Sequence, residues 1–73
     1  MTKIDRVKSV FRKVFGESTT VGLDTTKKDI PKWDSINHLS LILELEEEFN
    51  VSFSIEQMEK MNSVDCILKT LNP

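Results

Sequence analysis

The chain has 73 residues, of which 38% are hydrophobic, so we expect one small domain over residues 1–73 with a single modest core. Most of such a core is needed to offset the entropy lost on folding. A buried active site of several residues, and hence an enzyme, is therefore not expected. The longest uninterrupted apolar run has three residues, so neither a transmembrane span nor a signal peptide is expected.

Cysteine and charge usage set two further expectations. Cys66 is the single cysteine, so we expect no internal disulfide, no zinc site and a reduced, cytoplasmic location. The net charge is −2, but residues 1–15 are mostly basic, whereas residues 34–59 carry seven acids and no Lys or Arg. Acidic surfaces repel nucleic acid and attract basic protein partners. The blander interpretation is a solubilising helix face.

The first expected element is a helix over about residues 3–15, with Thr2 as its cap and Gly16 as its end. Its apolar residues have the spacing of one buried stripe: Ile4, Val7, Val10, Phe11, Val14 and Phe15.

Residues 17–34 have the composition of an irregular connection, which is long for a small domain. We expect Val21, Leu23 and Ile30 to fix this connection to the core, and Trp33 to cover the start of the next helix. A packed loop of this kind suits the delivery of a functional residue, because loops often carry function.

The second helix is expected from Ser35 to Phe49, with Asp34 as its cap. At 100° per residue its apolar residues form two groups. We assign one group to the core: Leu41, Ile42, Leu45 and Phe49.

The other group, Ile36, Leu39 and Leu43, lies about 145° away around the helix axis and is flanked by Glu46 and Glu47. One core needs only one broad helix face. An apolar strip that is bordered by acids and begins beside the first serine of the helix indicates a partner-docking surface. The alternative is that the long connection buries this strip.

Two further helices are expected after Asn50, which ends the second. Ser54 and Gln57 form a capping box for a short third helix. Its apolar residues are Ile55, Met58 and Met61. Ser63 or Asn62 caps the last helix, and Pro73 closes the chain. The core positions of that helix are Val64, Ile67, Leu68 and Leu71. The sequence thus predicts an all-α, small four-helix bundle: three longer helices plus one short helix, with a long loop between helices one and two.

Ser35 is the residue with the most chemical interest. At the first turn of a helix its hydroxyl lies among unpaired N–H groups at the positive end of the helix dipole, where an attached phosphate is favoured. By itself an Asp-Ser pair there is usually only a cap. His38 follows one turn later, but no oxyanion site or water-excluding pocket is indicated, so a Ser–His hydrolase is not expected. We expect His38 to face the core side and pack against the connection.

The chain resembles the acyl carrier proteins, on Asp34-Ser35-Ile36, Leu39, Leu41-Ile42-Leu43 and Leu45-Glu46-Glu47-Glu48-Phe49. The stretch Glu59-Lys60-Met61-Asn62-Ser63-Val64 also resembles the junction of their third and fourth helices. The tripeptide alone is a weak signature. Its combination with the Leu-Glu-Glu-Glu-Phe block, in a chain of this length, is more specific.

This resemblance implies that a phosphopantetheinyl transferase attaches 4′-phosphopantetheine to Ser35 from coenzyme A with magnesium. The distal thiol of the arm would hold an acyl group as a thioester for acyl-loading and acyl-transferring enzymes with basic docking surfaces. A monomer is expected for such a shuttle. The docking positions that the resemblance implies are Asp34, Ile36, Leu39, Leu43, Glu46 and Glu47, with Glu56 and Met61 in second rank.

The chain departs from the general fatty-acid carriers at several positions. Two of their usual acidic positions are Asn37 and Ser40 here, and both Trp33 and the basic first helix are atypical. We interpret the chain as a specialised carrier for a lipid, polyketide, surface-polysaccharide or other dedicated pathway. Two alternatives stay open: a peptidyl or aminoacyl carrier, and a helical adaptor that binds a basic partner without being modified.

Overall fold

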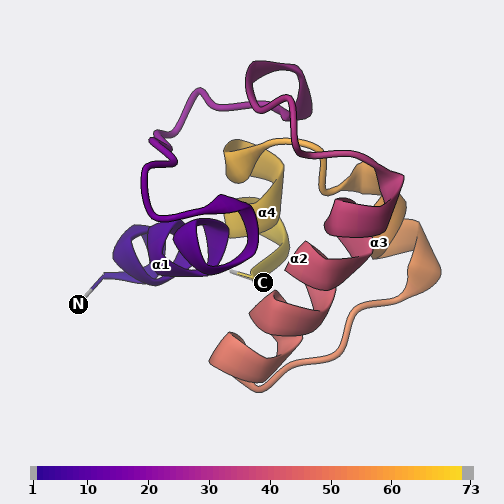
Figure 1. Ribbon diagram of the computed structural model, residues 1–73. Helices are drawn as coiled ribbons and strands as arrows, with labels where there is room; N and C mark the ends of the chain where they lie inside the picture. Colours follow the sequence, from indigo (N-terminus) through magenta and orange to yellow (C-terminus); the bar gives the residue numbers. More distant parts are fainter. Residues whose placement is uncertain (1, 72–73) are drawn as a thin grey trace.

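The computed structural model describes residues 2–71, and these form four α-helices and no strand. The helices are α1 (Lys3–Phe15), α2 (Ser35–Phe49), α3 (Ile55–Lys60) and α4 (Val64–Leu71), and the connection holds a 3₁₀ turn, η1 (Lys27–Asp29). The predicted bundle of three longer helices and one short helix is confirmed (Figure 1). None of these helices is long and apolar enough to cross a membrane. The expected end at Pro73 lies outside the described residues.

Helix α1 begins and ends as its sequence predicts. Thr2 and Asp5 form a capping box, in which each side chain accepts a hydrogen bond from the backbone N–H of the other residue. Gly16 ends the helix at φ 113°, a conformation that favours glycine. Its N–H donates to the Arg12 carbonyl oxygen. The face toward the core buries Val7, Val10, Phe11 and Phe15.

The core lies between α1, α2, α4 and the connection. Trp33 is buried as predicted, and its ring meets Phe11 edge to face, with 5.2 Å between the ring centroids. The predicted core face of α2 buries Leu41, Ile42 and Leu45, while Phe49 is partly buried against the same core. The connection closes one side of the core just before α2 begins.

The connection arches over the bundle between α1 and α2 (Figure 1). Val21 and Ile30 are buried, as predicted. The prediction for Leu23 is wrong: its side chain is exposed, because it lies in the turn that the hydrogen bond from the Thr25 N–H to the Gly22 carbonyl closes.

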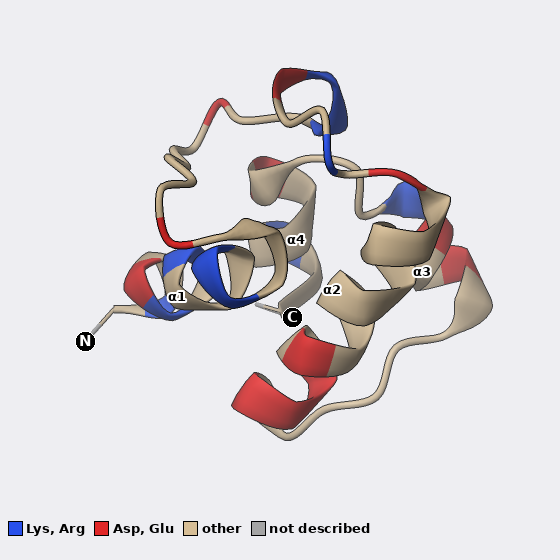
Figure 2. Cartoon of the chain, in the orientation of Figure 1, with Lys and Arg blue, Asp and Glu red and all other residues tan. Residues whose placement is uncertain are grey.

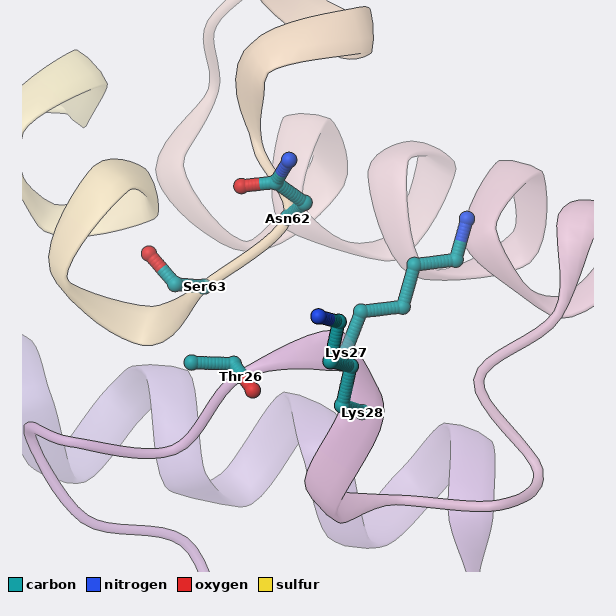
Figure 3. A pocket seen from close by; sticks show the side chains of 5 residues that line it. All are labelled: Thr26, Lys27, Lys28, Asn62 and Ser63. Carbon is teal, nitrogen blue, oxygen red and sulfur yellow. The ribbon is translucent and has the colours of Figure 1, made fainter.

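The connection is also fastened to the junction of α3 and α4 by an isolated antiparallel bridge. The Lys27 N–H donates to the Asn62 carbonyl, and the Val64 N–H donates to the Thr25 carbonyl, each at 2.9 Å. Figure 3 shows side chains from both segments around one pocket at this bridge. The path of the chain toward α2 is therefore set by backbone bonds as well as by apolar contacts.

The remaining helix boundaries also follow their capping residues. Asn50 ends α2 in the left-handed conformation, at φ 53°. Ser54 and Gln57 form the predicted capping box of α3. Of the two caps considered for α4, Ser63 is the one observed, because its hydroxyl accepts a hydrogen bond from the Cys66 N–H at 3.1 Å.

Candidate functional site

Ser35 is the first residue of α2, and its side chain is exposed. The Asp34 carboxylate accepts the Asn37 N–H at 2.9 Å, which confirms the predicted cap. The Asn37 side-chain amide in turn donates to the Lys32 carbonyl at 2.7 Å. The backbone on both sides of Ser35 is thus held, while the Ser35 hydroxyl makes no hydrogen bond within residues 2–71.

The second apolar group of α2 is exposed, with solvent-accessible fractions of 79% for Ile36, 55% for Leu39 and 56% for Leu43. We call these three residues the exposed stripe. The alternative, in which the connection buries them, is wrong. On α3, Ile55 is likewise exposed, at 73%. The protein therefore displays large apolar side chains on the helix that begins with Ser35.

The acids of α2 divide between two sides of the helix, a division that the sequence analysis missed. Two of them pair with α1: Arg6 Nε lies 2.9 Å from the Glu48 carboxylate, and Lys13 Nζ lies 3.5 Å from that of Glu44. The Arg6 guanidinium also donates to the Glu48 carbonyl and stacks over the Phe49 ring. Figure 2 shows the basic α1 and the acidic lower end of α2. The opposite charges of the two helices could have indicated this pairing.

Glu46 and Glu47, both predicted as docking residues, differ in their surroundings. Glu47 is exposed and has no ion-pair partner within the described residues. Glu46 is half-buried, and its carboxylate accepts the Phe53 N–H at 2.8 Å. This bond depends on the path of the chain after Asn50, for which the sequence carries no local pattern.

The two second-rank positions also differ. Glu56 is exposed, and its Oε1 lies 3.5 Å from Nζ of Lys60, one turn later on α3. Met61 is completely buried in the core, where the chain leaves α3. Its place in the predicted docking surface is therefore corrected, because a side chain with no exposed area cannot contact a partner of the folded protein.

His38 lies one turn after Ser35 and uses both ring nitrogens. The Trp33 indole N–H donates to Nδ1 at 2.8 Å, and Nε2 lies 2.8 Å from the Met58 carbonyl oxygen. An indole N–H can only donate and a carbonyl can only accept, so these partners require the neutral tautomer with its proton on Nε2. The expected packing of His38 against the connection is confirmed, and neither nitrogen is left to take a proton from Ser35.

No protein-family model matches this chain. The assignment of a function therefore rests on Ser35 and on the surfaces beside it.

Proposed function

We propose that this protein is an acyl carrier protein that holds acyl groups as thioesters on a 4′-phosphopantetheine arm attached to Ser35. The arm would supply a thiol on a flexible tether, and a thioester keeps the acyl group reactive. The folded chain would present this group to partner enzymes. The observation that carries the proposal is an exposed serine at the head of a helix whose outer face is the exposed stripe.

The surroundings of Ser35 fit a phosphodiester. The hydroxyl is exposed and makes no hydrogen bond within the described residues, so a modifying enzyme can reach it without breaking a contact. It also lies at the N-terminal end of a 15-residue helix, where the backbone dipole favours negative charge. Asp34 keeps that helix end capped.

The surface beside Ser35 fits docking by a partner. The exposed stripe and Ile55 offer apolar contact, and burial of apolar surface is the dominant favourable term in most protein–protein association. Glu47, which has no ion-pair partner among the described residues, offers a negative charge that steers a basic partner. Asn37 and Ser40 stand where the general fatty-acid carriers have acids, so the N-terminal part of α2 is less acidic than in those carriers. We therefore propose that this protein has a dedicated set of partners.

The proposal is tested by the intact mass of the protein after incubation with coenzyme A, magnesium and a broad-specificity phosphopantetheinyl transferase. We expect the wild type to gain one phosphopantetheine and Ser35→Ala to gain none. Ser40→Ala is the matched control, because Ser40 is an exposed serine of the same helix. This control should gain the group as the wild type does.

Two results would contradict the proposal. A folded wild type that gains no mass with either this transferase or the transferase from its own source would favour the unmodified adaptor. Modification of Ser35→Ala would place the arm on another residue. Loading of the modified protein by acyl-activating rather than amino-acid-activating enzymes then separates an acyl carrier from a peptidyl or aminoacyl carrier.

A further inference from the structure

Two side chains of α2 hold the segment that contains α3, one at each end. Near the beginning of this segment the Glu46 carboxylate accepts the Phe53 N–H at 2.8 Å. In the last turn of α3 the Met58 carbonyl accepts the Nε2–H of His38, also at 2.8 Å. Both bonds join a side chain of α2 to the backbone of the α3 segment.

Helix α3 needs such support. It has six residues, which is too short for a helix to be stable by itself, and none of them is buried. Its buried apolar anchors flank it: Phe53 before the helix and Met61 after it, while Met58 within the helix packs against the core only in part. The helix between them exposes Ile55 and Glu56. The position of these two side chains relative to the exposed stripe therefore depends on how α3 is held.

We propose that Glu46 and His38 are positioning residues that hold α3 against α2, and that Glu46 acts through its hydrogen bond to Phe53 rather than through its charge. The effect on docking rests on the proposed function, in which a partner docks on α2 and α3. The role of the two hydrogen bonds in holding α3 does not depend on that function.

The neighbouring acid makes this distinction measurable. A hydrogen bond to a carboxylate is stronger than one between neutral groups, but a glutamine at position 46 keeps an acceptor oxygen of the same reach. Glu46→Gln thus removes the charge and retains the bond, whereas Glu46→Ala removes both. Glu47 makes no such bond within residues 2–71, so Glu47→Gln removes a charge alone.

His38 extends the support to the chain before Ser35. Its Nδ1 accepts the Trp33 indole N–H, and Trp33 is packed against Phe11 and Phe15 of α1. One imidazole therefore links the end of α3 to a buried ring only two residues before the serine. Loss of this side chain should free the end of α3 and leave the Glu46 bond in place.

Amide hydrogen exchange, followed by NMR on the unmodified protein, tests both positions. We expect Glu46→Ala to speed exchange of the Phe53 amide and the α3 amides by at least about tenfold relative to the Phe11 amide in α1, which reports global unfolding. Glu46→Gln should stay within about threefold of the wild type, and Glu47→Gln should match it. His38→Ala should speed exchange mainly at Met61, whose N–H also bonds to the Met58 carbonyl.

Kinetics of Ser35 modification test the link to docking. We expect Glu46→Ala to raise KM for the carrier about threefold or more with kcat nearly unchanged, and Glu46→Gln to restore the wild-type KM. Equal exchange in Glu46→Ala and Glu47→Gln would overturn the role of the bond. A KM raised equally in Glu46→Gln and Glu47→Gln, with α3 exchange unchanged, would assign Glu46 to charge. A wild type that is never modified defeats the proposed function, while the exchange rates still decide whether the two residues hold α3.

Discussion

The two sides of α2 are built differently. Toward α1 the helix buries Leu41, Ile42 and Leu45, and two of its acids form ion pairs with basic residues of α1. On its other sides it displays the exposed stripe and holds α3 through two side chains. Acids that are neighbours in the sequence thus have different partners. The number of acids in a stretch of helix therefore does not show which of those acids are accessible to a partner protein.

The largest expected difference in stability is between variants in which one leucine on each side of α2 is replaced by alanine. Leu45→Ala should lower the free energy of unfolding by about 3 kcal/mol, because it leaves a cavity at a completely buried position. Leu43→Ala should change that free energy by less than about 0.5 kcal/mol. Denaturation with urea measures both values. Similar losses for the two variants would contradict the division of α2 into a core side and a display side.

The ion pairs with α1 offer a second, smaller test. Arg6→Ala should cost about 1–2 kcal/mol of stability, because Arg6 bonds to the Glu48 carboxylate and carbonyl and stacks over Phe49. Lys13→Ala should cost less than about 0.5 kcal/mol, since its pair with Glu44 is longer and more exposed. Urea denaturation at low and high salt compares them. Equal costs would mean that the extra contacts of Arg6 add nothing.

The smallest expected effect is a difference in pH dependence between the N-terminal caps of α1 and α3. The Thr2 hydroxyl donates to the Asp5 carboxylate and holds the pKa of Asp5 below its ordinary value of 3.8. A lowered pKa in the folded state means that this cap stabilises α1 above that value and is lost as the pH falls through the lowered one. The α3 cap, made by Ser54 and Gln57, has no ionisable side chain.

Amide chemical shifts between pH 6 and pH 2 should therefore show the first turn of α1 titrating with Asp5, while the hydrogen bonds between Ser54 and Gln57 at the start of α3 persist. Asp5→Asn should remove the transition from α1. A transition that persists in this variant would mean that another group controls the end of the helix.

Local patterns were enough to predict the elements of this fold. Caps and apolar spacing placed α2 from Ser35 to Phe49, separated its buried face from the exposed stripe, and identified the capping box at Ser54. These features depend on residues a few positions apart, where the geometry of a helix fixes which side chains meet. The cap that precedes Ser35 was predicted for the same reason.

The error at Leu23 arises from a local turn, and the other errors and omissions arise from contacts between distant segments. Leu23 was assigned to the core, yet a turn carries its side chain into solvent, and Met61 was assigned to a surface although it fills the core. The bonds of Glu46 and His38 to the α3 segment depend on how the chain reverses after α2. A helical wheel shows the side of the helix on which such a side chain lies, but it does not show which backbone group of another segment lies within hydrogen-bond distance.

The bridge between the connection and the α3–α4 junction has a consequence for how the chain is made. The backbone groups of Thr25 and Lys27 find their partners on Asn62 and Val64, which leave the ribosome much later. The path that leads into Ser35 is therefore completed by residues synthesised after the serine, and a nascent chain that lacks them would present Ser35 on a segment that is not yet fastened.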